Sequence, residues 1–238
     1  MAYITKRNPW ATVWWSIALP GFGHIFMGQH FKGVVLMLWE IVFNHLGHVN
    51  LAIYHTMRGE YAIASQVIDY HFALVYPLFY MFAAYDSYRV CLELNSLEMD
   101  ERVQKKRKFQ RISFSMIGIS MLLRRSPILA TFWSGIITGF GQLYLDRGLK
   151  ALFMMAWYLT VVFKAHLTLA AFHALRGEFD QAAAVVDYQW ALFWPSIYMF
   201  GIVDAYHDCV EENNLAEEAF AYRLRKYIRN KGTFGGLR

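Results

Sequence analysis

Cysteine is scarce in this sequence, because the chain has only Cys91 and Cys209 among its 238 residues. A framework of several disulfides and a four-cysteine zinc site both need more thiols, so both are excluded. Charged residues are also few, at 17% of the chain, whereas hydrophobic residues make up 57% and aromatic residues 18%. This balance is too apolar for an ordinary soluble protein.

The sequence motifs of catalysis are missing as well. The chain contains no glycine-rich phosphate-binding loop, no pairing of a nucleophile with a general base, and no two carboxylates on one short helix face. We therefore expect a protein that is not an enzyme.

Long apolar runs are what the sequence has instead. The run GVVLMLWEIVFNHLGHVNLAIYHTM covers residues 33–57. At about 1.5 Å per residue, a helix of that length crosses a hydrocarbon core of about 30 Å. A cleavable signal peptide is not expected, because Pro20 and Gly21 interrupt the first apolar stretch and no small-residue cleavage site follows it. The sequence predicts the all-α class and a polytopic helical protein of the plasma membrane, the inner membrane of a bacterium.

Positive charge is concentrated in three places. They are Lys6 with Arg7, the segment 101–111 with Arg124 and Arg125 after it, and the tail 223–238. Basic blocks next to membrane spans are typical of cytoplasmic flanks that contact anionic headgroups. We expect both termini in the cytoplasm, the lipid bilayer as a partner, and no binding of nucleic acid.

The sequence of the first half of the chain is repeated in the second half. Adding 118 to a residue number in the range 9–95 gives its counterpart in the range 127–213 without a gap. About a third of the paired positions are identical, which is far above chance. The stretch HVNLAIYHTMRGE (48–60), for example, returns as HLTLAAFHALRGE (166–178). The predicted organisation is a first membrane repeat (1–95), a basic cytoplasmic or interfacial linker (96–125), a second membrane repeat (126–213) and a basic cytoplasmic tail (214–238).

The number of membrane crossings depends on the first apolar stretch of each repeat. WATVWWSIAL (10–19) ends where Pro20 and Gly21 interrupt it, and it is too short to span a bilayer. We expect a kinked or re-entrant segment there, a second one around Thr138 and Gly139, and four spanning helices in total. Six spanning helices, with the two repeats facing opposite ways, are the alternative.

The turn GFGHIFMG and the glycine that follows it, residues 21–33, resemble the signature of the two-transmembrane (TM two) domain family. In that family a Gly-x-Gly-His-x-Phe-Tyr-x-Gly turn joins two membrane helices, and an Asp closes the second helix. The resemblance implies that Asp86 is this closing Asp, with an extra helix interposed. The second repeat departs from the signature, because Gln142 replaces the histidine and Asp146 replaces a glycine. The opening is also similar to one that is common among bacterial multi-pass proteins, and the resemblance implies a topology without a chemistry.

Some of the repeated residues are typical of helix ends and tight turns. Glycine allows a bend or a close helix approach, an Arg-Gly pair suits a helix C-terminus, and aspartate can cap the next helix. We predict such structural roles for Gly21, Gly23, Gly139, Gly141, Arg58, Gly59, Arg176, Gly177, Asp69 and Asp187.

The other repeated polar residues are candidates for function. The candidate path or ligand residues are His48, His55, His166, His173, Asp86, Asp204, Glu40 and Asn44. His48 and His55 lie about 10 Å apart along a helix, so they cannot bind one metal ion together. They are interpreted first as histidines hydrogen-bonded across helices; the alternatives are a solute or proton path, or a haem or metal held by His48 and His166. Asp86 and Asp204 are each expected to pair with the residue three positions on, Arg89 or His207.

Together these features predict a non-enzymatic integral membrane protein that acts as a scaffold or assembly component of a membrane complex. Its expected partner is another membrane protein or a second copy of the chain. The alternative is a small transporter or channel with a path between the repeats, and a third hypothesis is a haem-bearing redox subunit. Outside that third hypothesis, no cofactor and no metal are expected.

Overall fold

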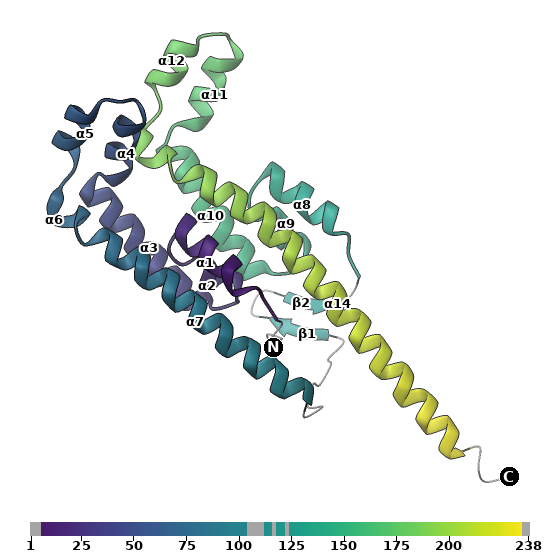
Figure 1. Cartoon of the computed structure of the whole chain (residues 1–238). Coiled ribbons are helices and arrows are strands. Elements are labelled where there is room, and N and C mark those ends of the chain that lie inside the picture. The colour runs from purple at the N-terminus through teal and green to yellow at the C-terminus, as the bar shows by residue number, and fades with distance from the viewer. Residues whose placement is uncertain (1–5, 104–111, 116–117, 122–123, 235–238) are drawn as a thin grey trace.

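The computed structural model describes residues 6–103, 112–115, 118–121 and 124–234. Helices dominate these ranges, which confirms the predicted all-α class (Figure 1). The helices of the first half are α1 (Pro9–Ala18), α2 (Phe22–Phe26), α3 (His30–Gly47), α4 (Val49–Met57), α5 (Tyr61–Val67), α6 (Tyr70–Ala73) and α7 (Tyr76–Val103). Those of the second half are α8 (Pro127–Ile136), α9 (Phe140–Tyr144), α10 (Gly148–Lys164), α11 (Leu167–Leu175), α12 (Phe179–Ala184), α13 (Tyr188–Ala191) and α14 (Trp194–Phe234). Within the expected linker, β1 (Ile112–Ser115) and β2 (Gly118–Met121) form a short antiparallel hairpin.

Each helix from α8 to α14 begins 118 positions after the corresponding helix from α1 to α7. The sequence explains this register at the first helix of each half. Pro9 and Pro127 are the first residues of their helices. Proline lacks an N–H, which costs nothing there because the first N–H groups of a helix have no intrahelical acceptor. Asn8 caps α1 by accepting a hydrogen bond from the Trp10 N–H at 2.9 Å, and Ser126 caps α8 in the same position.

The long apolar run of the first half is two helices rather than one. α3 ends at Gly47, α4 begins at Val49, and the two helices are bent by 64°. His48 between them has a left-handed backbone with φ of +51°, which stops the helix. The carbonyl of Gly47 at the break accepts a hydrogen bond from the Asp69 N–H at 3.0 Å. The break between α10 and α11, at His166, is bent by 60°.

Taken singly, none of the helices in the described ranges combines the length and the apolar composition needed to cross a bilayer. Three pairs of helices, each bent at a short break, meet both requirements when the two members are taken together. The pairs are His30–Gly47 with Val49–Met57, Tyr61–Val67 with Tyr70–Met99, and Gly148–Lys164 with Leu167–Leu175.

The two halves point the same way in Figure 1. α7 and α14 run in the same direction, and the α4–α5 and α11–α12 projections lie at the same end of the molecule. α1 packs along α7, and α8 packs along α14. Both long helices continue past the predicted boundaries at residues 95 and 213. The halves meet where the Phe22 ring stacks on the Phe200 ring, with their centroids 4.1 Å apart.

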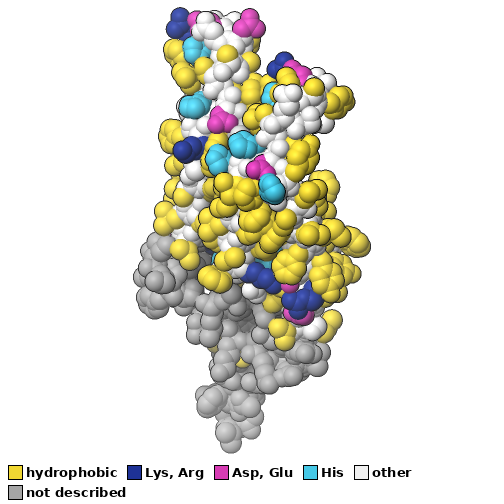
Figure 2. All heavy atoms as spheres, turned by 90° about the vertical axis from the view of Figure 1, so that its left-hand side faces the viewer, with side chains coloured by type: hydrophobic (Ala, Val, Ile, Leu, Met, Phe, Trp, Pro, Cys, Tyr) yellow, Lys and Arg dark blue, Asp and Glu magenta, His cyan; other side chains and the backbone are white. Residues whose placement is uncertain are grey.

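Several large apolar side chains of α3 face outward while two of its polar ones face inward, although Leu36 and Met37 are buried. Its exposed large apolar residues are Phe31, Val35, Leu38, Val42 and Leu46. Glu40 and Asn44 of the same helix are buried. Figure 2 shows, on one face, hydrophobic side chains across the middle, charged side chains at the projecting tips and again below the hydrophobic band, and histidines in the upper part. A large exposed apolar surface marks a region that meets lipid or another protein.

Candidate functional site

The first candidate site is built around the buried carboxylate of Asp86 on α7. Its Oδ2 lies 2.8 Å from Nε2 of His24 on α2 and also contacts Nζ of Lys32 on α3. Its Oδ1 accepts a hydrogen bond from Arg89 Nη2 at 2.9 Å, which is the pairing expected from the sequence. The His and Asp that the TM two resemblance singled out are thus in contact, although 62 residues separate them in the chain.

The second candidate site is the counterpart of the first, at Asp204 on α14. Gln142 Nε2 donates to Asp204 Oδ2 at 3.0 Å, the same contact that His24 makes in the first half. Lys150 Nζ lies 2.7 Å from Asp204 Oδ1 and 2.9 Å from Asp208 Oδ2. The expected pairing of Asp204 with His207 is corrected here: the charged partner of Asp204 is Lys150, and the His207 ring packs against a Phe26 ring instead.

The second site extends into a network of charges that ties the two halves together. Arg147 Nη1 lies 2.8 Å from Asp208 Oδ1, and its Nε donates to Glu212 Oε1 at 3.0 Å. Burial alone would lower the pKa of Arg147, but the carboxylates of Asp208 and Glu212 raise that pKa above its ordinary value. Arg7, from the first half, forms an ion pair with Glu211. Charges from both halves therefore neutralise one another in one cluster.

A third polar group, without basic residues, lies where α3 and α4 meet α13. Tyr76 donates a hydrogen bond to Glu40 Oε1 at 2.5 Å, and Asn44 Nδ2 donates to the same oxygen at 3.1 Å. Gln189, from the second half, donates through Nε2 to Asn44 Oδ1 at 2.7 Å. Asn50 Nδ2 donates to the Gln189 carbonyl at 3.0 Å. Gln189 therefore completes a buried amide and carboxylate network that begins in the first half.

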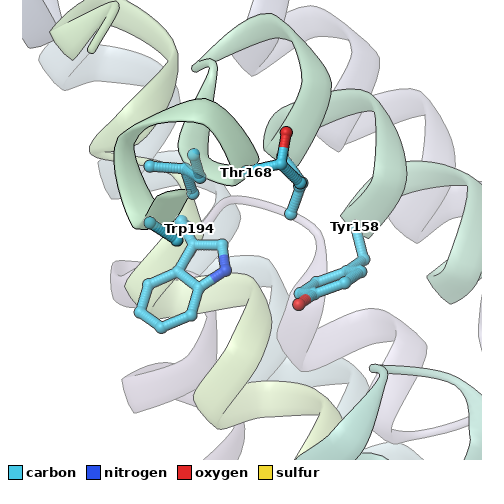
Figure 3. Close-up of a pocket in the computed structure, with 6 residues that line it drawn as sticks. Tyr158, Thr168 and Trp194 are labelled. Carbon is cyan, nitrogen blue, oxygen red and sulfur yellow. The ribbon is translucent and has the colours of Figure 1, made fainter. Parts of the chain in front are cut away.

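The equivalent place in the second half is a pocket of about 370 Å³. Its lining residues are Tyr158, Val162, Leu167, Thr168, Ala171 and Trp194. Each of the six stands 118 positions after a residue at the first-half network: Glu40, Asn44, Val49, Asn50, Ile53 and Tyr76. Figure 3 shows the Tyr158 and Trp194 rings on either side of the space, with Thr168 above them. The first half thus holds a closed polar network where the second half holds an open, mainly apolar pocket.

The four predicted histidines lie at helix ends rather than on one continuous face. His48 and His166 are exposed, and both have left-handed backbones at the helix breaks. His55 Nδ1 lies 2.7 Å from Glu60 Oε2, and His173 Nδ1 lies at the same distance from Glu178 Oε2. The hydrogen bond from His55 and the charge of Arg58 lower the pKa of Glu60. Glu60 and Glu178 were not among the predicted residues, although both are repeated in the sequence.

The residues assigned to turns and caps lie at turns and helix ends. Gly59 has φ of +77° and Gly177 has φ of +78°, each directly after an arginine that is the C-cap residue of α4 or α11. Asp69 Oδ1 accepts a hydrogen bond from the His71 N–H at 2.9 Å, and Asp187 does the same for Gln189. Gly21 and Gly139 have φ of +99° and +108° at the start of α2 and α9. Gly23 and Gly141 let α2 and α9 approach α1 and α8 closely.

The predicted path residues lie in separate surroundings. Asp86 and Asp204 belong to different charge clusters, Glu40 and Asn44 belong to the amide network, and the histidines lie at helix ends. Across the part of the chain that the structure describes, no three metal-ligating side chains lie close enough to hold one ion. Sequence reasoning missed Lys150, Asp208, Arg147, Gln189 and Tyr76. The identity of Lys32 and Lys150 in the repeat was the signal that could have found the first of these.

Comparison with known proteins produced no match for this chain. No protein-family model matches it, no curated protein matches it, and no solved structure matches it. Function is therefore inferred from the chain's own residues and their geometry.

Proposed function

We propose that this chain is a duplicated integral membrane protein that serves as a scaffold, an assembly component of a membrane complex. The observation that carries the proposal is the placement, on α3, of large apolar side chains outside and polar ones inside. Glu40 and Asn44 are buried on the same helix that exposes a stripe of large apolar residues. A soluble protein would expose the polar side chains, whereas a bilayer favours the opposite arrangement because lipid cannot solvate them.

Two features support four crossings of the plasma membrane with both termini in the cytoplasm. The α4–α5 and α11–α12 projections lie at one end of the molecule, which is the arrangement expected if each half crosses out to its projection and back. The α1–α2 and α8–α9 segments are short and bent at Gly21 and Gly139, as expected of re-entrant elements packed within protein. Six crossings would instead turn the two halves in opposite directions.

The closed state of the polar clusters supports a scaffold over a solute path. The Asp86 and Asp204 carboxylates each make two or more polar contacts within the chain. The first-half network likewise joins α3, α4, α7 and α13 through direct hydrogen bonds. Within the described part of the chain, Glu40 Oε2 and His24 Nδ1 are buried without a hydrogen-bond partner, but the other contacts link side chains of different helices directly. Such direct links fix helices in one arrangement, which is the property that an assembly component needs.

Labelling of introduced cysteines tests the topology. Ser65→Cys in α5 and Ala183→Cys in α12 are matched sites, exposed and 118 positions apart. In a background with Cys91→Ala and Cys209→Ala, we expect an impermeant maleimide to label both sites in intact cells. Lys6→Cys is expected to react only after the membrane is permeabilised. Labelling of one projection but not the other would favour six crossings and contradict the four-crossing topology.

Cross-linking in native membranes tests the scaffold role. If the chain works as an assembly component, a lysine-reactive or photoactivated cross-linker should join it to a protein partner before detergent is added. We expect the cross-linked product to survive purification under denaturing conditions at a defined mass above that of one chain. Recovery of the lone 27.8 kDa chain from membranes under all cross-linking conditions would contradict a scaffold role.

A further inference from the structure

We propose that a second copy of this chain docks into the Tyr158–Trp194 pocket through its α6 helix. His71 of the second copy enters beside Thr168, in the position that Gln189 occupies beside Asn50 within one chain. This inference names the partner of the proposed scaffold and so rests on that function. The contact is the one that already joins the two halves, formed once more between copies.

The internal contact has two parts, and the first is at α13. Gln189 lies between Asn44 and Asn50, and its Oε1 accepts a hydrogen bond from the Leu51 N–H at 2.8 Å. The Tyr188 ring next to it stacks on the Tyr54 ring, with the centroids 3.8 Å apart. α13 of the second half is thus inserted against α3 and α4 of the first half.

The equivalent surfaces are left open in the same chain. The counterpart of Gln189 is His71, which is exposed on α6, and the counterpart of Asn50 is Thr168, which is exposed at the pocket. Tyr70, the counterpart of Tyr188, is 54% exposed, and Phe172, the counterpart of Tyr54, is 51% exposed. A pair of aromatic rings that is stacked inside the chain therefore recurs with both members facing outward.

The local backbone of α6 matches that of α13. Both helices have four residues, and both begin after an aspartate whose side chain accepts a hydrogen bond from the second helical residue, His71 or Gln189. The receiving site matches as well, because Leu169 holds the position in α11 that Leu51 holds in α4. A first-turn N–H at this position lacks an intrahelical partner, and an imidazole nitrogen can accept its hydrogen bond as the Gln189 oxygen does. The aromatic walls of the pocket suit an imidazole ring better than an amide.

The second part of the internal contact is aromatic and independent of the pocket. Phe200 on α14 is buried against Trp15 of α1 and Phe22 of α2. All three residue types recur at the equivalent positions as Phe82, Trp133 and Phe140. Phe82 is 50% exposed on α7, and Trp133 is exposed on α8. The counterparts of the three side chains are thus present, with Phe82 and Trp133 exposed and Phe140 half-buried.

The ion pair between the halves also has a counterpart of the same residue types. Within the chain, Arg7 forms an ion pair with Glu211 across the halves. Their counterparts are Arg125 and Glu93, the same two residue types. Glu93 lies on α7 with its side chain 57% exposed and pairs with Arg89, and Arg125 pairs with Asp146. A Glu93–Arg125 contact between copies therefore requires both ion pairs to exchange partners.

The contact between copies can repeat from one copy to the next. Within one chain, the α1, α2 and α4 side of the first half meets the α13 and α14 side of the second half. The elements that take no part in that contact include α6 and α7 on one side of the molecule and α8 and α11 on the other side in Figure 1. A head-to-tail contact between different surfaces builds rings or open chains, whereas a self-complementary contact stops at two units.

Cysteine cross-linking between differently tagged copies tests this arrangement in membranes. One copy carries His71→Cys and the other carries Thr168→Cys, both in the background with Cys91→Ala and Cys209→Ala. Co-expression and mild oxidation are expected to give a disulfide-linked product that contains both tags. Asn50→Cys with Gln189→Cys in one chain is the matched control, and it is expected to cross-link within the chain without adding mass.

Two further variants separate specific docking from chance collision. Leu175→Cys lies on the same helix as Thr168 but about 10 Å further along it, beyond the reach of a disulfide, so its pairing with His71→Cys should give little product. Ala171→Trp fills the exposed pocket without entering the core and is expected to reduce the His71–Thr168 product by at least tenfold.

A photoactivatable residue at Thr168 identifies what occupies the pocket. An adduct at twice the chain mass supports docking of a second copy, whereas an adduct with lipid or with a different protein would overturn it. Docking of a second copy would also be overturned if the His71–Thr168 product is absent while the Asn50–Gln189 control forms its disulfide. If docking of a second copy is overturned, a cross-linked partner of another kind in native membranes would still support the scaffold function. Recovery of only the lone chain would contradict both the docking and the scaffold function.

Discussion

Lys150→Met is expected to lower the free energy of unfolding by about 3–5 kcal/mol, the usual effect of removing one member of a buried ion pair. The Lys150 side chain is 4% exposed, and the Asp204 and Asp208 side chains beside it are fully buried. Arg147 still neutralises Asp208 in the variant, but Asp204 keeps only the Gln142 amide. An unpaired carboxylate in such a place must take up a proton or draw in water. Chemical denaturation of the purified protein in mixed micelles measures the effect.

The first half provides the matched control for this prediction. Lys32 is the counterpart of Lys150, and its side chain is 38% exposed. When the Lys32 amine is removed, Asp86 still contacts both His24 and Arg89. Lys32→Met is therefore expected to cost about 1 kcal/mol or less. Adding Asp204→Asn and Asp208→Asn to Lys150→Met should recover much of the lost stability, because no buried charge is then left without a partner. Equal losses of unfolding free energy from Lys32→Met and Lys150→Met would show that burial of Lys150 does not determine how much its ion pairs stabilise the protein.

The helix ends of this protein are readable from the sequence because the chemistry that makes them is local. Arg58 and Gly59 stand next to each other, and Asp69 caps a helix that starts at the following residue. A pattern a few residues long contains all the atoms involved, and the repeat displays the pattern twice. The all-α class follows from similar local information, since apolar runs and their lengths decide it.

The candidate site was less predictable because its contacts join distant parts of the chain. His24 and Asp86 are separated by 62 residues, and only the resemblance to a known turn signature suggested that they belong together. A lysine near a helix start is usually solvent-exposed, so nothing local distinguishes the buried Lys150 from the partly exposed Lys32. The difference arises from Asp208, which has Val90 as its counterpart and adds a second carboxylate.

Glu40, Asn44 and His48 are spaced four residues apart, which would place them on one face of a continuous helix. The left-handed backbone at His48 ends that helix and starts α4 in a new direction. Glu40 and Asn44 therefore stay in the core while His48 is exposed. A non-glycine residue rarely adopts this conformation, and no sequence pattern predicts it. The four-residue periodicity therefore failed at His48, where the backbone is left-handed.

Gly21→Ala is expected to lower the free energy of unfolding by about 2–5 kcal/mol, the sum of about 1–2 kcal/mol of left-handed backbone strain and about 1–3 kcal/mol of overpacking. Gly21 has φ of +99°, and a Cβ there would lie 2.2 Å from the Gly33 carbonyl oxygen. Because that atom belongs to the backbone of α3, relief requires α2 and α3 to separate. The separation would in turn disturb His24 and Lys32, which approach Asp86 from those two helices. Thermal and denaturant unfolding in detergent measure the loss.

Gly59→Ala isolates the strain from the packing. Gly59 has φ of +77°, but no atom lies within 4 Å of the Cβ that alanine would add. We therefore expect Gly59→Ala to cost only the backbone component, about 1–2 kcal/mol. Gly139→Ala should resemble Gly21→Ala, since its Cβ would lie 2.8 Å from the Ala151 carbonyl oxygen at φ of +108°. If Gly21→Ala and Gly59→Ala lost the same stability, the close approach of α2 to α3 would not be what holds Asp86 among its partners.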